Sequence, residues 1–89
     1  MPGFFIVMDA PYYVYAIYSK SKNYIYVGIT NCVQRRVNEH NLGYNKTTKP
    51  YRPFELLYQE KLGTREEARK REKYLKGGSG RKFLRKLIE

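Results

Sequence analysis

Five residues of types that can cut a phosphodiester bond occur in order along this chain. Tyr15 and Tyr26 lie in two tyrosine-rich segments, Arg36 and His40 follow in a segment with helical spacing, and Glu72 comes later. A tyrosine hydroxyl or a histidine can orient or deprotonate water, and an arginine can stabilise the charge that develops on phosphate oxygens. These residue types suggest a phosphodiester-cutting site.

The chain is short and strongly basic. Its 89 residues include 18 Lys and Arg against 8 Asp and Glu, which gives a formal net charge of +10. Such an excess favours a polyanionic partner, namely DNA, RNA or an anionic membrane surface. A protein associated with RNA or the ribosome is an alternative that rests on charge alone. A chain of this length forms one small domain with a modest core.

Residues 1–11 are expected to form an N-terminal extension ahead of a domain at 12–89. Phe4–Met8 is apolar, but it is too short to span a membrane and has no Lys or Arg before it to make a signal peptide. An extra strand, a flexible tail and translation from Met8 remain open for this segment. Cys32 is the single cysteine, so no intrachain disulfide or thiolate cluster for zinc is available. This fits a reducing compartment and predicts a cytoplasmic protein without a membrane partner.

Two aromatic and β-branched runs predict the strands that carry the tyrosines, at 12–18 and 24–30. The polar residues between them predict an antiparallel hairpin. With a loop over Ser19–Lys22, Tyr15 stands opposite Tyr26, so both side chains share one face. A slip of one residue would send them to opposite faces.

The next segment predicts a helix from an N-cap at Asn31 to about Leu42, ended by Gly43. The residues that face inward follow the i, i+3, i+4, i+7 repeat: Val33, Arg36, Val37 and His40. The two candidate residues among them, Arg36 and His40, lie at the edge of this stripe. After a loop over 44–53, residues 54–60 predict a third strand. The expected fold is α/β in the α+β sense, a small three-stranded antiparallel sheet flanked by helices.

Thr64 and Glu67 form a capping-box pattern at the start of a helix that runs to Lys76 and ends at the glycine pair that follows. Ser79 is expected to cap a last short helix. Within the first of these helices, Glu72 lies four residues after Ala68 and three before Leu75, which places it on the stripe expected to face inward. It could form an i, i+4 ion pair with Lys76. Near a phosphate site it could instead bind Mg²⁺, which prefers oxygen ligands.

Basic residues outside these positions predict where nucleic acid binds. The expected contacts lie in the proline-containing loop and on the Glu72 helix: Lys46, Lys49, Arg52, Arg69 and Lys76. Tyr44 and Tyr51 in the same loop could stack on bases. Most of the remaining tyrosines are expected to pack within the sheet.

This pattern resembles the GIY-YIG nuclease superfamily, in its small single-domain form, over nearly the whole chain. Val14-Tyr15 is similar to the end of the first family motif, with Tyr13 where the family often has glycine, and Tyr26-Val27-Gly28 resembles the second. By the same resemblance, Arg36 is the catalytic arginine, His40 the following histidine or tyrosine, and Glu72 the metal-binding glutamate.

The resemblance implies a metal-dependent endonuclease that hydrolyses DNA phosphodiester bonds with a single Mg²⁺ or Mn²⁺, in repair or recombination. Glu72 would hold the metal, Arg36 would stabilise the phosphate, and the tyrosines and His40 would position and activate water. Any of Tyr15, Tyr26 or His40 could be the base.

Two departures from the family are visible. Ile29 stands where some repair members carry lysine, and no asparagine follows Glu72. With no separate recognition domain expected, single-stranded or branched DNA is the predicted substrate. The alternative is an inactive nucleic-acid-binding module with the same fold, against which the presence of all five candidate residues argues.

Overall fold

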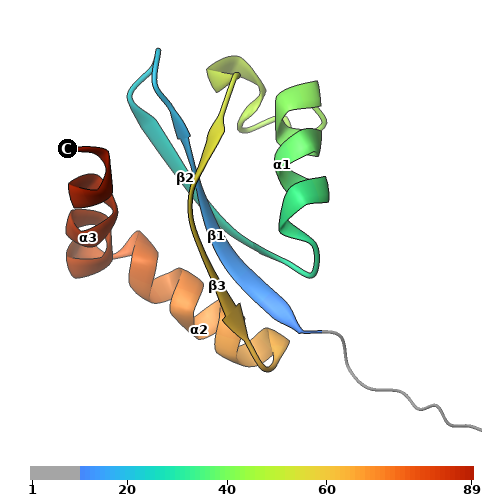
Figure 1. Cartoon of the computed structure of the whole chain (residues 1–89), viewed down its shortest axis with the longest axis vertical. Helices are drawn as coiled ribbons and strands as arrows, with labels where there is room; N and C mark the ends of the chain where they lie inside the picture. The colour runs from blue at the N-terminus through green and yellow to red at the C-terminus, as the bar shows by residue number, and fades with distance from the viewer. Residues whose placement is uncertain (1–10) are drawn as a thin grey trace, which may run out of the picture.

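The computed structural model describes residues 11–89 as a three-stranded antiparallel sheet with helices on both faces (Figure 1). The strand order is β2-β1-β3, so β1 is central. Helix α1 lies on one face, while α2 and α3 pack together on the other. This arrangement confirms the predicted fold class. The elements are β1 (Tyr12–Ser19), β2 (Tyr24–Thr30), α1 (Val33–Leu42), the 3-10 turn η1 (Lys49–Tyr51), β3 (Glu55–Leu62), α2 (Arg65–Lys76) and α3 (Gly78–Ile88).

The predicted N-terminal extension lies outside the described residues, except for Pro11. Between residues 11 and 89, none of the helices combines the length and the apolar character that crossing a membrane requires.

The β1–β2 register keeps the two tyrosines on one face but does not place them opposite each other. Tyr15 pairs with Gly28, and Tyr26 pairs with Ile17. The predicted direct pairing is therefore wrong by two residues, because the turn occupies residues 20–23, with Asn23 in the left-handed region at φ 52°. An even shift preserves the face of every side chain. The rings of Tyr15 and Tyr26 accordingly lie 6.4 Å apart between centroids.

Alternate residues of β1 feed two separate cores. Val14 and Ala16 point to the α2 and α3 face, where they meet aliphatic side chains such as Leu75 and Leu84. Tyr15 and Ile17 point to the α1 face and pack with aromatic and β-branched side chains, including Val33, Phe54 and Tyr26. The period of two along a strand thus divides one short segment between two environments.

The helix ends differ from the predictions in their capping residues. Helix α1 begins after Cys32 rather than Asn31, and no side chain caps it. The Asn31 side-chain oxygen instead accepts a hydrogen bond from Arg35 Nη2 at 3.1 Å. Helix α2 has the predicted capping box, in which the side chains of Thr64 and Glu67 each accept a hydrogen bond from the other's backbone N–H.

Helix α3 begins at Gly78, and its N-cap residue is Gly77, which has no side chain to form a capping hydrogen bond. The predicted cap at Ser79 is therefore also wrong. Gly80 lies directly against the backbone of Tyr74 and Leu75, which leaves no room for a side chain. This close approach lets α3 fold back against α2. Strand β3 begins one residue later and ends two residues later than predicted.

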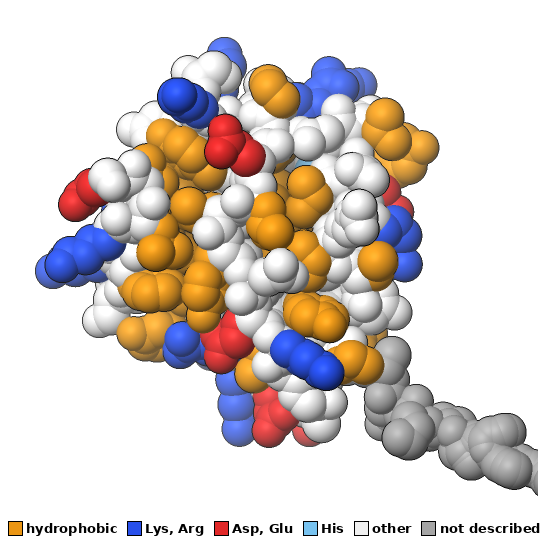
Figure 2. All heavy atoms as spheres, viewed as in Figure 1, with side chains coloured by type: hydrophobic (Ala, Val, Ile, Leu, Met, Phe, Trp, Pro, Cys, Tyr) orange, Lys and Arg blue, Asp and Glu red, His pale blue; other side chains and the backbone are white. Residues whose placement is uncertain are grey.

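Hydrophobic side chains gather around β3 and α3 on the face that Figure 2 shows. The exposed large hydrophobic residues on these elements are Leu56, Phe83 and Leu87. Phe83 meets Tyr58 edge to face at 5.2 Å between ring centroids. Basic side chains lie mainly around the rim of this view.

Candidate active site

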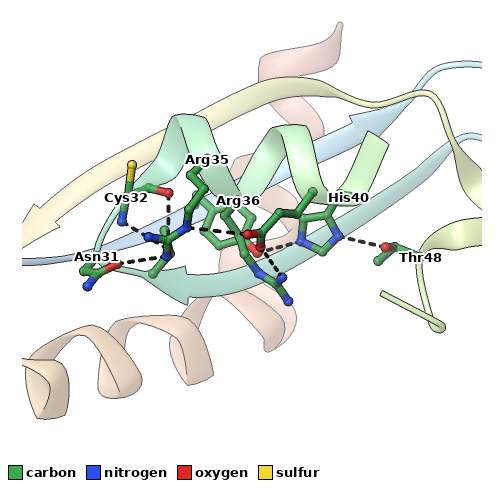
Figure 3. A network of polar contacts seen from close by, with 9 residues as sticks. Asn31, Cys32, Arg35, Arg36, His40 and Thr48 are labelled. Carbon is green, nitrogen blue, oxygen red and sulfur yellow. Dashed lines mark hydrogen bonds and ion pairs between the residues drawn. The ribbon is translucent and has the colours of Figure 1, made fainter. Parts of the chain in front are cut away.

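A chain of three buried polar side chains lies between β1, α1 and the following loop. The Tyr15 hydroxyl is 2.8 Å from His40 Nε2, and His40 Nδ1 is 2.7 Å from Thr48 Oγ1. His40 and Thr48 are fully buried, and Tyr15 is 1% exposed. A neutral imidazole has one N–H and one lone pair, so one hydroxyl donates to the ring and the other accepts from it. Figure 3 shows His40 reaching from α1 toward Thr48.

Burial keeps both Tyr15 and His40 neutral at pH 7. It raises the pKa of Tyr15 to about 12, with Tyr26 acting in the same direction and Arg36 opposing it. Burial also lowers the pKa of His40 to about 4, and the positive charge of Arg36 adds to this effect. The ring is therefore available as a proton acceptor, while the phenol retains its proton.

Gly28 explains how the Tyr15 hydroxyl fits between the strands and the helix. A Cβ atom at position 28 would lie 2.9 Å from the Tyr15 oxygen and 3.1 Å from two ring carbons. Because β1 and β2 pair Tyr15 with Gly28, the ring lies across the space that a side chain would fill. The glycine of the Tyr26-Val27-Gly28 motif is thus needed for the position of the phenol.

Tyr26 completes the aromatic surroundings of His40. The two ring centroids lie 5.0 Å apart, closer than the 5.9 Å between His40 and Tyr15. Tyr26 is half-buried, so it lies between the enclosed polar chain and the solvent. Phe54 meets the imidazole from a further side, edge to face at 6.1 Å. Aromatic rings therefore fix the orientation of the imidazole from several sides.

Arg36 lies one helical turn before His40, at the edge of the buried region, with 30% of its side chain exposed. Its Nη1 atom donates to Glu39 Oε1 at 2.8 Å, and this hydrogen bond raises the pKa of Arg36. The guanidinium also lies near enough to Tyr15 to affect the pKa of the phenol. Arg36 is thus a partly exposed cation beside Tyr15, a suitable position for meeting phosphate oxygens.

Glu72 projects from α2 between the buried Ala68 and Leu75, as its spacing predicted. Its side chain is 15% exposed, and Lys76 Nζ lies 3.1 Å from its Oε2 atom. The ion pair considered from the sequence is therefore present. The carboxylate is also close enough to Tyr15 to raise the pKa of the phenol slightly.

The donor set fits a metal held by few protein ligands. Within residues 11–89, no group of three or more His, Cys, Asp and Glu side chains is close enough to enclose a metal ion. Glu72 would be the carboxylate ligand, and water and phosphate oxygens would complete the shell. Mg²⁺ is often bound in this way, through one or two carboxylates together with substrate phosphates.

The predicted nucleic-acid contacts are exposed and lie on two elements. Lys46, Lys49 and Arg52 project from the loop after α1, while Arg69 and Lys76 lie on α2. Their exposure leaves these cations accessible to phosphate. Arg52 Nε donates to the Lys49 carbonyl at 3.0 Å, and Lys76 pairs with Glu72.

The two loop tyrosines differ from each other. Tyr44 is 71% exposed and can meet a base. Tyr51 is half-buried and stacks on Tyr24, with ring centroids 4.0 Å apart and planes 15° apart. The suggestion that Tyr51 is an exposed stacking residue is therefore wrong, because Tyr24 already covers one face of its ring.

Thr48 is the residue of this site that sequence reasoning missed. It lies between Thr47 and Lys49 in a polar loop, where nothing in the pattern marks a buried position. The Asn45 side-chain oxygen accepts hydrogen bonds from the backbone N–H groups of Thr47 and Thr48, at 2.8 and 3.1 Å. The available signal is Asn45, a residue type whose side chain bonds to the backbone two residues on and so predicts a turn, but not the burial of Thr48.

The base of this loop is joined by a pair of side-chain to backbone hydrogen bonds. Asn41 Nδ2 donates to the Phe54 carbonyl at 3.0 Å, and the Phe54 N–H donates to Asn41 Oδ1 at 2.7 Å. The last turn of α1 is thereby tied to the start of β3. Both ends of the loop that carries Thr48 are therefore held in place.

Comparison with known proteins places the chain in a family. The GIY-YIG catalytic domain matches residues 11–86. A UPF0213 protein of Staphylococcus saprophyticus is 37% identical over 79 residues, which covers 88% of this chain and 95% of the relative. A UPF0213 protein of Staphylococcus haemolyticus is 41% identical over 81 residues, covering 90% and 96%. No solved structure matches. The protein belongs to the GIY-YIG family.

Proposed function

We propose that this protein is a metal-dependent endonuclease that hydrolyses phosphodiester bonds of DNA. The observation that carries the proposal is the buried chain of Tyr15, His40 and Thr48, with Arg36 and Glu72 both near enough to Tyr15 to shift its pKa. Apolar side chains of the same shape would stabilise the fold about as well as these three hydrogen-bonded polar ones, so the buried polar chain favours a chemical role. Membership of a nuclease superfamily supports the same conclusion.

Proton transfer in this mechanism runs through Tyr15. The hydroxyl has a pKa of about 12, so it does not exist as a phenolate at neutral pH. It accepts a proton from the attacking water while its own proton passes to His40 Nε2, and the Nδ1–H is held by Thr48. The imidazolium then returns its proton to Tyr15, which passes one to the leaving alkoxide oxygen through water, so that both side chains regain their starting protonation states. This assigns the base function to the Tyr15–His40 pair, with Tyr26 holding the ring in place.

Charge on the phosphate is met by two groups from different helices. Arg36 donates to the non-bridging oxygens, where negative charge grows as water attacks. A divalent cation such as Mg²⁺ or Mn²⁺, held by Glu72, would supply charge stabilisation and weaken the bond to the leaving oxygen. Before that cation binds, Lys76 neutralises Glu72 through their ion pair.

Single-stranded or branched DNA is the substrate that we propose. The exposed cations lie on a loop and on one helix of a small domain, a surface suited to following a backbone rather than reading base edges in a groove. Exposed Tyr44, two residues before Lys46 in sequence, offers a ring for an unpaired base.

The direct test incubates the full chain with single-stranded, duplex and branched DNA in Mg²⁺, Mn²⁺ or EDTA. We expect metal-dependent cutting that Glu72→Ala and Arg36→Ala abolish. Glu66→Ala is the matched control, since it removes an exposed carboxylate from the first turn of the same helix and should leave cutting unchanged. Cutting by Glu72→Ala at the wild-type rate would refute the metal-ligand role. Binding without cutting under every condition would support the inactive module instead.

A further inference from the structure

A polar hollow of about 390 Å³ opens beside Arg36. Arg35 and Arg36 line it from α1, and Arg65 lines it from the first turn of α2. Tyr12 and Thr30, where β1 begins and β2 ends, form part of its wall. Three guanidinium groups from two helices thus converge on one concave surface.

The arginines are only partly neutralised. Glu39 is the acidic residue of the lining; it lies 2.8 Å from Arg36 Nη1 and 3.6 Å from Arg35 Nε. Figure 3 shows both arginines on α1, with Arg35 also reaching Asn31. Arg65 has no ion-pair partner among the acidic residues between positions 11 and 89. The hollow therefore carries an excess of positive charge.

Arg65 is held toward this hollow by packing. Its guanidinium carbon lies 5.9 Å from the centroid of the Tyr12 ring, within the range of a cation–π contact. Such a contact restrains the side chain but leaves its N–H groups free to donate. Guanidinium groups bind phosphate oxygens through paired hydrogen bonds, so the chemistry of the hollow suits a phosphate.

We propose that this hollow binds the phosphate next to the scissile one on the DNA strand. The inference rests on the proposed function, because Arg36 is shared: it faces Tyr15 on one side and the hollow on the other. A strand whose scissile phosphate meets Arg36 has its neighbouring phosphate within reach of Arg35 and Arg65. The hollow would fix the position and direction of the strand and take no part in the chemistry.

The test measures binding in EDTA, so that its result does not depend on cutting. A short fluorescent single-stranded DNA is titrated by anisotropy at several salt concentrations. We expect Arg65→Gln and Arg35→Gln each to weaken binding about threefold to tenfold and to reduce the salt slope by about 0.7. Arg65→Lys should largely restore the slope, because it keeps the charge.

Lys22→Gln is the matched control for loss of one positive charge. Lys22 lies in the β1–β2 turn, at the other end of the hairpin from Tyr12 and Thr30, about 20 Å away along the strands. It should leave affinity and salt slope close to wild type. Equal effects of Lys22→Gln and Arg65→Gln would mean that only net charge matters, and would overturn the proposal.

A second measurement locates the phosphate. Single neutral methylphosphonate linkages are placed in turn along the DNA, and one of them should weaken wild-type binding more than the rest. That penalty should shrink in Arg65→Gln and in Arg35→Gln, because one of the two partners of the phosphate is already missing. A penalty of wild-type size in both variants would refute the subsite. Specific binding without any cutting in metal would keep the subsite and reject only the proposed nuclease.

Discussion

The two faces of the sheet are built from neighbouring residues of the same strand, yet they differ in kind. On the α2 and α3 face, Val14 and Ala16 join an aliphatic core. On the α1 face, Tyr15 carries a hydroxyl into the interior, where His40 and Thr48 continue a buried polar chain. The side chains that β1 sends to the first face contribute only packing, whereas those that it sends to the second include the hydroxyl of the proposed proton relay. Along this strand, stability and the proposed chemistry thus lie on opposite sides, and Glu72 joins the proposed site from α2.

Of the substitutions that test this contrast, removal of the Tyr15 hydroxyl should lower the cleavage rate most. We expect Tyr15→Phe to lower the cleavage rate about 10²- to 10⁴-fold, because the proton relay loses its first member. The cost in folding stability should be about 1–3 kcal/mol, the penalty for leaving a buried imidazole nitrogen unpaired. Single-turnover cleavage and denaturant unfolding measure the two quantities. Wild-type cleavage by this variant would remove Tyr15 from the mechanism.

A truncation on the other face should show the opposite pattern. Leu84 is fully buried in the aliphatic core. Leu84→Ala should reduce the free energy of unfolding by about 2–5 kcal/mol through lost burial and the cavity left behind. Cleavage per folded molecule should stay within about threefold of wild type, measured well below the melting temperature. A large loss of chemistry without loss of stability would break the division between the faces.

The α1 face should also make folding stability depend on pH. The pKa of His40 is lowered from 6.5 to about 4 by burial, so between these values the unfolded chain binds more protons than the folded one. Stability should therefore rise with pH through this window, by at most about 3 kcal/mol, and level off above pH 6.5.

His40 is the single histidine of the chain, and carboxylates titrate mostly below about pH 4.5, so the range from pH 5 to 7 reports on it. Urea unfolding across that range should show the slope in wild type. His40→Gln should flatten it. An equal slope in this variant would show that another group is responsible.

Substitution of Thr48 should lower the cleavage rate less than removal of the Tyr15 hydroxyl does, and it tests whether the last hydrogen bond of the polar chain orients His40. Thr48→Val keeps the shape but removes the hydroxyl, and we expect kcat to fall about tenfold with little change in KM, the cost of one buried hydrogen bond. Thr48→Ser should recover most of the activity. If Val and Ser variants lose activity equally, Thr48 acts through packing rather than by orienting His40.

Features set by local sequence could be predicted. The aromatic runs defined β1 and β2, Gly43 ended α1 in the left-handed conformation, and Thr64 with Glu67 formed a capping box. Each depends on residues within a few positions of one another. Their physical determinants are therefore contained in a short window of sequence.

Features set by long-range geometry could not be predicted from the chain alone. The turn with left-handed Asn23 moved the register by two residues, although the alternation of faces kept Tyr15 and Tyr26 together. Thr48 became part of the site only because the loop folds back onto His40. The hollow beside Arg36 requires Arg65 from a separate helix. Such contacts depend on how elements pack.

The hydrogen-bonded pair between Asn41 and Phe54 has a consequence for how this protein can diversify. Because the pair fixes both ends of the intervening loop, added residues cost only the slowly rising entropy of loop closure, about 0.6 kcal/mol for each doubling of length. Provided that Thr48 keeps its place, the exposed remainder can be exchanged without moving His40. If the proposed nuclease activity holds, this loop is a position where substrate preference can change while the surroundings of His40 stay the same.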